Sequence, residues 1–287
     1  MSARVAVVEF PGVNCEAETA WALTRVGLEA EVFRWTRPAA ELTRFDAYVL
    51  PGGFSYQDRV RGGALAAQHA LVEVLERRAA AGAPLLGICN GAQVLVEAGL
   101  VPGGGSIDLA LARNRMPGRS GYYARWIRVR VEPSRCLFTA TLEPGTLLPL
   151  PVAHGEGRFT ARDPGRVAAL VAAGQTPLRY AAADGGIATA FPDNPNGSEE
   201  AVAAVCNPEG NVLALMPHPE RAQDLGALSR AVGGAWAARR EARLDEAAPV
   251  ATAIADVGPA RGAGDEPGPG LALFEGLSRH LAGRGAR

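Results

Sequence analysis

Short apolar runs alternate with segments of helical spacing along the first hundred residues, and this alternation leaves few folds open. Each run ends in a turn of glycine or proline, as Tyr48–Leu50 does at residues 51–53. Runs that are apolar throughout are typical of parallel strands buried on both faces. The sequence therefore predicts an α/β fold with an open, mostly parallel sheet and helices on both faces. The expected strands are Val5–Phe10, Glu31–Phe33, Tyr48–Leu50 and Pro84–Cys89, and the expected helices are Glu16–Val26, Ala64–Ala81 and Gly91–Ala98.

The second half of the chain has a different pattern, which predicts antiparallel additions to the sheet. Residues 125–132 alternate between apolar and charged side chains, as in a half-exposed strand. Two further apolar runs, Ala201–Cys206 and Asn211–Met216, are joined by the turn sequence Asn-Pro-Glu-Gly. That composition predicts a hairpin.

Residues 225–270 are rich in Ala, Gly, Pro and Arg and contain few large apolar side chains. Such a composition buries little surface, so we expect a surface insertion within a single domain that spans residues 1–287. Inside it, the charged segment Trp236–Ala247 predicts a short helix. Helical spacing returns in Leu271–Leu281, which we expect to pack on the sheet.

Composition excludes several classes of protein. The chain of 287 residues has 29 basic and 30 acidic residues, a net charge of −1, and so no general attraction for nucleic acid or an anionic membrane. All its basic residues are arginine. The absence of lysine excludes an ordinary P-loop, Schiff-base or pyridoxal chemistry, and a protein kinase.

Cysteine usage and the N-terminal sequence predict a cytoplasmic protein. The four cysteines are far apart and form no C-x-x-C pair, which favours neither a disulfide framework nor a zinc cage. No apolar stretch reaches the ~18 residues of a membrane span, and we expect no export signal. The four are Cys15, Cys89, Cys136 and Cys206.

The strongest local motif is G-x-C-x-G at residues 87–91, where an expected strand meets an expected helix. It is the thiol version of the nucleophile elbow, in which flanking glycines allow a sharp turn and the side chain stands above the sheet. The helix N-terminus favours a thiolate at Cys89. A buried structural cysteine in a βα turn remains the alternative on this pentapeptide alone.

A thiolate needs a base, and two H-x-E segments offer one at residues 154–156 and 218–220. In either, the carboxylate could orient the imidazole, so spacing alone does not choose between them. Context favours His218, because an apolar strand leads into it and prolines flank it, whereas His154 is followed by glycine. Neither segment has a third ligand at suitable spacing, so we expect no zinc site. The other histidines, expected to be ordinary helix residues, are His69 and His280.

Five motifs in order resemble those of the class I glutamine amidotransferases, and more narrowly of the glutaminase subunits of phosphoribosylformylglycinamidine synthase. The resemblance covers nearly all of the chain except residues 225–270 and implies the flavodoxin-like fold of that family. The motifs are PGGFSYQD (51–58), GICNGAQ (87–93), PVAHGEG (151–157), NPNGS (194–198) and MPHPERA (216–222).

The resemblance also implies a site and an activity. Glutamine would be hydrolysed to glutamate, and the ammonia would pass to a synthetase partner that uses ATP and Mg²⁺, with a small bridging subunit as a further partner. No cofactor is expected on this chain. The implied roles are nucleophile for Cys89, base for His218, orienting carboxylate for Glu220, oxyanion hole for the backbone N–H groups of Gly53 and Asn90, and substrate binding for Gln93.

The chain departs from the family pattern in one loop and leaves other functions open. Where similar subunits have FSYGDYLR, this chain has Gln57 in place of glycine and Arg59 in place of tyrosine, so the loop conformation is in question. Cys15 lacks an elbow and is expected to pack, as are Cys136 and Cys206. The alternatives are a glutaminase of another synthetase, which FSYQD and VAHGEG disfavour, and a non-catalytic protein of related fold, which PHPE disfavours.

Overall fold

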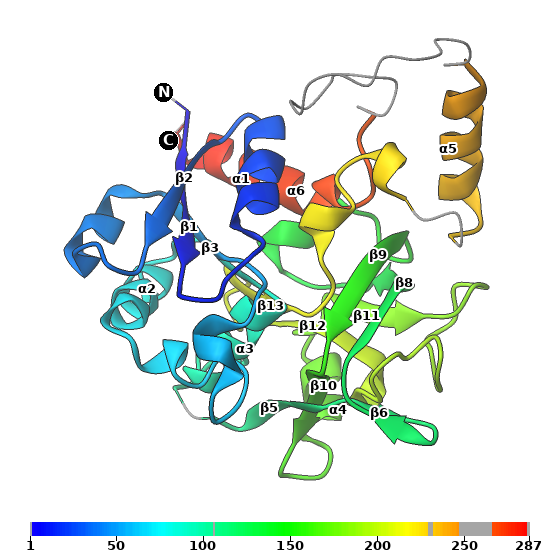
Figure 1. Ribbon diagram of the computed structural model, residues 1–287, viewed down its shortest axis with the longest axis horizontal. Helices are drawn as coiled ribbons and strands as arrows, with labels where there is room; N and C mark the ends of the chain where they lie inside the picture. The colour runs from blue at the N-terminus through cyan, green and yellow to red at the C-terminus, as the bar shows by residue number, and fades with distance from the viewer. Residues whose placement is uncertain (1, 106, 229–231, 247–265, 286–287) are drawn as a thin grey trace.

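A nine-stranded sheet forms the centre of the protein (Figure 1). The computed structural model describes residues 2–105, 107–228, 232–246 and 266–285. In the sheet the strand order is β2-β1-β3-β4-β13-β12-β11-β8-β9. The strands are β1 (Arg4–Glu9), β2 (Glu29–Arg34), β3 (Ala47–Leu50), β4 (Leu85–Ile88), β5 (Leu109–Arg113), β6 (Arg115–Met116), β7 (Arg119–Ser120), β8 (Tyr123–Val131), β9 (Leu147–His154), β10 (Glu156–Ala161), β11 (Leu178–Ala181), β12 (Val202–Cys206) and β13 (Val212–Leu215). The α-helices are α1 (Glu16–Arg25), α2 (Ala70–Ala80), α3 (Asn90–Glu97), α4 (Arg166–Ala172), α5 (Ala235–Glu246) and α6 (Leu271–Gly285).

The sheet has a parallel and an antiparallel half, as the two sequence patterns predict. Strands β2, β1, β3, β4 and β13 are parallel neighbours. Strands β12, β11, β8 and β9 extend the sheet by antiparallel pairing. The predicted hairpin is confirmed as β12 and β13, and the alternating segment is confirmed as β8. The doubly wound α/β architecture is therefore confirmed.

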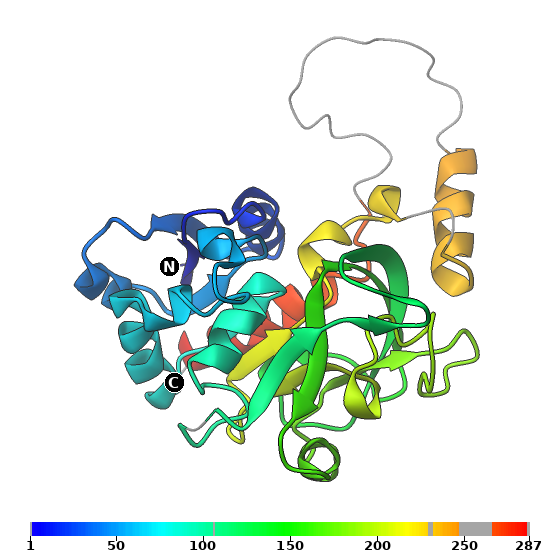
Figure 2. The same ribbon diagram turned by 60° about the horizontal axis from the view of Figure 1, so that its bottom comes forward.

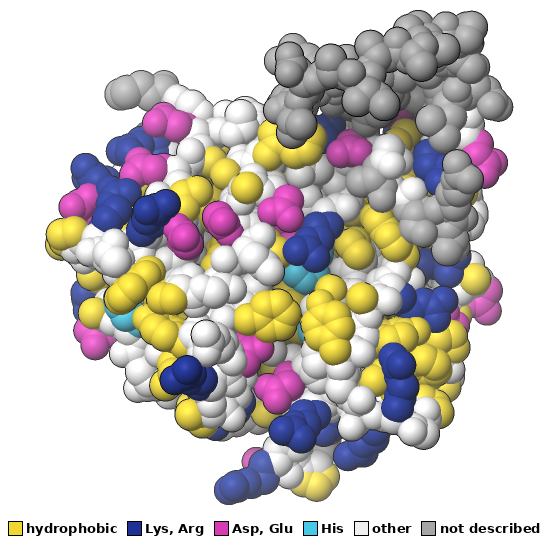
Figure 3. All heavy atoms as spheres, in the orientation of Figure 1, with side chains coloured by type: hydrophobic (Ala, Val, Ile, Leu, Met, Phe, Trp, Pro, Cys, Tyr) yellow, Lys and Arg dark blue, Asp and Glu magenta, His cyan; other side chains and the backbone are white. Residues whose placement is uncertain are grey.

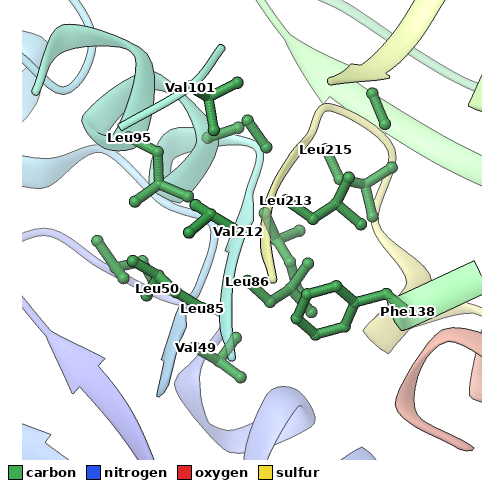
Figure 4. Packing of buried hydrophobic residues seen from close by; sticks show 14 of the residues in the cluster. Val49, Leu50, Leu85, Leu86, Leu95, Val101, Phe138, Val212, Leu213 and Leu215 are labelled. Carbon is green, nitrogen blue, oxygen red and sulfur yellow. The ribbon is translucent and has the colours of Figure 1, made fainter. Parts of the chain in front are cut away.

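The parallel strands are buried because helices cover them. Figure 1 shows α1 and α6 together on one side of these strands and α2 and α3 on the other. Figure 4 shows Val49 and Leu50 of β3 packed with Leu85 and Leu86 of β4, next to side chains of β13. Because both faces are apolar, the polar chemistry of these strands is confined to the loops at their ends.

One predicted helix is shorter than expected. Instead of spanning Ala64–Ala81, the regular helix α2 begins at Ala70. His69 is its N-cap, and the side-chain Nδ1 accepts a hydrogen bond from the backbone N–H of Leu71 at 3.2 Å. The residue that caps the N-terminus of a helix has a non-helical backbone, and His69 is extended. The helical spacing before His69 therefore does not continue into α2.

The predicted insertion is narrower than residues 225–270. Leu225 and Leu228 are buried at one end, and at the other Gly270 lies so close to Pro219 that a Cβ there would meet its carbonyl oxygen at 2.0 Å. Residues at both ends are therefore buried or closely packed, and Gly270 packs on the loop that follows β13. The predicted short helix is confirmed as α5, which stands beside the sheet in Figure 2. Most of the remainder, residues 247–265, lies outside the described residues.

Charges are mixed on the surface, as the net charge suggests. On the face shown in Figure 3, arginines are interspersed with acidic side chains. Within the described ranges, no helix is long and apolar enough to cross a membrane.

Candidate active site

Cys89 lies at the junction of β4 and α3 with a backbone that few residues adopt. Its φ of 50° and ψ of −103° are strained for a residue with a side chain. The flanking glycines make this turn possible: a Cβ at Gly87 would meet the carbonyl oxygen of Gly91 at 2.6 Å, and one at Gly91 would meet that of Leu50 at 1.9 Å. The predicted elbow is present, at the carboxyl end of the parallel strands.

His218 follows β13 and lies at the same edge of the sheet. Its backbone N–H donates to the carbonyl oxygen of Pro151 in β9 at 2.8 Å, and its Nδ1 is 2.5 Å from a carboxylate oxygen of Glu220. Both side chains are buried, at 2% and 1% exposure. The other ring nitrogen, Nε2, is buried without a hydrogen-bond partner among the described residues. The ring is therefore held by its carboxylate while Nε2 stays available.

Electrostatics favour a charged imidazole at this position. Burial lowers the pKa of His218, but the negative charges of Glu220 and of the Cys89 thiolate outweigh burial, and the net pKa lies well above its ordinary value. A protonated His218 beside Cys89 is thus the expected resting state. Such a pair combines a nucleophile with an acid for the leaving group.

Cys89 lines a small cavity of about 200 Å³ at the carboxyl ends of the parallel strands. The Cys89 Sγ also lies 3.8 Å from the carbonyl oxygen of Ala153, at the end of β9. The cavity is lined by Gly53, Phe54, Asp58, Cys89, Gln93, Tyr122, Ala153, His154, Gly155 and Glu156. Parallel and antiparallel halves of the sheet therefore both contribute to one pocket.

The two predicted backbone donors lie beside the thiol. Gly53 lines the cavity with a φ of 150°, and a Cβ there would meet the Cα of Val13 at 2.6 Å, so only glycine fits. Asn90 begins α3, and the first turn of a helix leaves N–H groups without an intrahelical acceptor. An anionic oxygen near the Cys89 sulfur would find donors of this kind.

The side chains of Asn90 and Gln93 form one network under the cavity. Asn90 Nδ2 donates to Gln93 Oε1 at 2.8 Å, and Gln93 Nε2 donates to the backbone oxygen of Glu156 at 2.7 Å. Asn90 Oδ1 accepts from the N–H of Ser55 at 3.0 Å. The amide of Gln93 is therefore engaged with the protein, while the residue lines the pocket.

The loop with the unusual sequence has a strained backbone. Tyr56, Gln57, Asp58 and Val60 all have positive φ, between 51° and 74°. Gln57, at φ 61°, stands where similar subunits have glycine, the residue best suited to that conformation. Position 57 therefore has a left-handed backbone conformation although it carries a side chain. The loop presents the Asp58 carboxylate to Asn90 Nδ2, 3.2 Å away.

His154, the other candidate base, has no carboxylate partner on its ring. Its Nδ1 lies 3.1 Å from the Oδ1 of Asn114, and Asn114 Nδ2 donates to the backbone oxygen of His154 at 2.7 Å. Burial first, and then the charge of His218, lower the pKa of His154 to about 3. Glu156 accepts instead from the backbone N–H of Gly62. His154 is therefore a neutral wall residue.

Cys15 contacts His218, whereas the sequence, which places Cys15 after the first strand and within reach of the site, favours a packing role for it. It is fully buried, with its Sγ 4.0 Å from His218 Nδ1 and 3.0 Å from Nη2 of Arg221, which donates to it. Cys15, His218 and Glu220 place ligand atoms within 4.8 Å of one another. His218 is already bonded to Glu220, and the Arg221 guanidinium donates to the Cys15 sulfur. These three residues are therefore better suited to orienting the imidazole than to holding a metal ion.

Sequence reasoning missed Asn114 and the Asp58 carboxylate as parts of this site. Asn114 makes three side-chain hydrogen bonds to the β9–β10 turn and a fourth to the carbonyl oxygen of Gly121, and no local motif marks it. Asp58 lies inside the motif FSYQD, so its presence in the site could have been suspected from that motif alone.

The chain is similar in sequence to known proteins along most of its length. The model of the CobB/CobQ-like glutamine amidotransferase domain matches residues 2–244. A phosphoribosylformylglycinamidine synthase subunit PurQ from Methanothrix thermoacetophila is 48% identical over 226 residues, covering 76% of this chain and 86% of that protein. The subunit of the same name from Thermomicrobium roseum is 47% identical, covering 80% and 90%.

A solved structure is also similar. A chain in the structure of PurLQS from Thermotoga maritima superposes with a TM-score of 0.68 at 29% identity, covering 98% of this chain and all of that one. The similarity therefore extends over the sheet, the elbow and the loops that surround them.

Proposed function

Because the chain belongs to the family of CobB/CobQ-like glutamine amidotransferase domains, we propose that it is the glutaminase subunit of a phosphoribosylformylglycinamidine synthase. It hydrolyses glutamine to glutamate and ammonia, and the ammonia serves purine biosynthesis. The observation that carries this proposal is Cys89 on a strained elbow beside the buried His218–Glu220 pair.

In the first half of the reaction, the Cys89 thiolate attacks the carbon of the glutamine side-chain amide. The C–S bond forms, and the negative charge on oxygen is stabilised by the N–H groups of Gly53 and Asn90. Donors of this kind contribute a few kcal/mol to the transition state. Protonated His218 gives its proton to the amide nitrogen, the C–N bond breaks, and ammonia leaves.

In the second half, neutral His218 takes a proton from water, and the hydroxide adds to the γ-glutamyl thioester. The C–S bond breaks, the new γ-carboxyl group loses its proton to solvent, and glutamate leaves; the thiolate is restored and His218 remains as the imidazolium. Glu220 stabilises that imidazolium in both steps, because its carboxylate bonds the opposite nitrogen. Gln93 supports the end of the pocket that receives the amino-acid part of the substrate.

The partner is the synthetase subunit of the same enzyme, and a small bridging subunit is a further one. ATP and Mg²⁺ belong to the synthetase, since this chain has neither lysine nor a P-loop motif. A cytoplasmic location also belongs to this proposal, and it is supported by four free cysteines.

The test is Cys89→Ala in the reconstituted complex with the synthetase. Glutamine-dependent synthesis should fall by at least about 1000-fold, whereas synthesis from added ammonia should persist, because only the first uses the thiolate. Loss of both activities, or retention of both, would contradict the assignment of Cys89.

A further inference from the structure

The cavity beside Cys89 presents hydrogen-bond acceptors and no positive side chain. Among its lining residues, Asp58 and Glu156 contribute carboxylates, no arginine is present, and the only histidine, His154, is neutral. The amide of Gln93 is engaged with its neighbours. A ligand that complements this wall must therefore be rich in N–H donors.

His154 adds a buried acceptor to this wall. Its Nδ1 faces the oxygen of Asn114, whose amide nitrogen is committed to two carbonyls, so Nδ1 carries the proton. Nε2 is then a lone-pair acceptor, and it is buried without a partner among the described residues. The ring, which is 3% exposed, leaves an acceptor unsatisfied until a donor arrives.

The two carboxylates are only partly compensated. Asp58 has one hydrogen bond, from Asn90 Nδ2, and no ion pair in the described chain. Glu156 has the N–H of Gly62 and, at 3.7 Å, Arg113, whose side chain is 85% exposed to solvent. Burial of Asp58 and the charge of Glu156 raise the pKa of Asp58 to about 6. Like charges in one small pocket favour a cationic ligand.

We propose that the carboxylate of Asp58, with Glu156 beside it, is the subsite that binds the α-ammonium group of glutamine and so selects α-amino substrates. The inference rests on the proposed glutaminase function and deepens it. Glutamine carries an ammonium group at one end and an amide NH₂ at the other, so it supplies donors to the acceptor side chains of the cavity, while the N–H groups of Gly53 and Asn90 remain for the amide oxygen. Asp58 reaches the pocket only because its loop adopts positive φ angles, which gives that strained backbone a role.

The test compares two substrates in the reconstituted complex: glutamine, and glutaramate, the amide of the same length without the α-amino group. The variant is Asp58→Asn, which keeps an oxygen for Asn90 but removes the charge. For glutamine, kcat/KM should fall about 10- to 100-fold, mainly through KM, because a charge-assisted hydrogen bond is lost. For glutaramate it should change less than about 2-fold, so the preference for glutamine collapses.

Glu156→Gln provides a second variant with the same expected direction and a smaller effect, because Arg113 already offsets part of its charge. Asp184→Asn, in an exposed turn, is the matched control and should leave both substrates unaffected. Equal losses for both substrates in Asp58→Asn would overturn the subsite in favour of a structural role, and so would an unchanged preference. If the wild type hydrolyses neither substrate, the proposed function itself fails, which is a different result.

Discussion

The pattern H-x-E occurs twice at one edge of the sheet, and the two histidines have different bonding partners and opposite shifts in pKa. At residues 218–220 the carboxylate bonds the imidazole, and the pKa of His218 is raised despite burial. At residues 154–156 the imidazole bonds an asparagine, and burial lowers the pKa of His154 to about 3. Glu156 is directed to Gly62 and the pocket instead.

The difference shows that the role of a histidine is decided by its partner rather than by its spacing from an acid. Proline between His218 and Glu220 starts a tight 3₁₀ turn, which brings the carboxylate back to the ring. Gly155 instead separates the end of β9 from the start of β10, and there Glu156 bonds the backbone N–H of Gly62 rather than the ring of His154. The same three-residue pattern thus yields one histidine bonded to its carboxylate and one histidine bonded to an asparagine.

Replacing each histidine by asparagine is the strongest way to break this comparison. His218→Asn should lower glutamine-dependent synthesis by about 1000-fold, because base and acid are both lost. His154→Asn should retain at least about a tenth of the activity, since a neutral wall residue contributes one acceptor. Steady-state rates in the complex measure both variants, and ammonia-dependent synthesis is the control for assembly. A more damaging His154→Asn would reverse our assignment of the two pairs.

Removing each carboxylate charge sharpens the comparison through its pH dependence. Burial lowers the pKa of His218, and the charge of Glu220 raises it. The other titratable or charged groups near the ring are Cys15, Cys89, Arg221 and His154. Activity needs protonated His218, so it is present below that pKa and lost as pH rises through it. In Glu220→Gln the alkaline limb of kcat/KM should move to lower pH, with an activity loss of about 10- to 100-fold.

Glu156→Gln is the matched variant for that experiment. Because Glu156 bonds no histidine, the alkaline limb should stay where it is in the wild type. If the alkaline limb of kcat/KM shifted equally in Glu156→Gln and Glu220→Gln, the hydrogen bond between Glu220 and His218 would not be what sets the pH profile.

The sequence predicts the fold well because its signals are local. Apolar runs that end in glycine or proline locate β1, β3 and β4, and the spacing of two glycines around Cys89 predicts a turn that only glycine allows on either side. The start of α2 was wrong because His69 caps the helix within a helical pattern. Close backbone packing at Gly270 has no signature in composition, so composition alone does not locate the ends of the predicted insertion.

The site is less predictable, because several of its contacts join residues distant in sequence. Asn114 contacts His154 across 40 residues, and Arg221 contacts Cys15 across 206. Neither pairing is implied by a motif. The choice of His218 over His154 could be argued from the strand and prolines that precede and follow it, but the neutral state of His154 follows only from its burial beside Asn114.

The smallest expected effect is on the stability of the fold. It concerns Asp58, whose pKa is raised by burial and by Glu156. Burial and Glu156 raise the pKa of Asp58 from 3.8 to about 6, so the ionised carboxylate destabilises the fold. The cost is absent below the unfolded pKa of 3.8, grows as pH rises from there to about 6, and is constant above that. Asp58→Asn should therefore raise the melting temperature by about 2 °C above pH 7 and leave it unchanged near pH 4. A variant that is less stable at both pH values would contradict this reading of the pocket.

The central claim is that Cys89, and not the nearby Cys15, attacks the amide of glutamine. A diazoketone analogue of glutamine alkylates the attacking thiol, so mass spectrometry of the digested protein locates it directly. We predict one added mass, on the peptide that contains Cys89, together with loss of glutamine-dependent synthesis and protection by glutamine. Addition to Cys15, or activity that survives complete labelling of Cys89, would contradict the account.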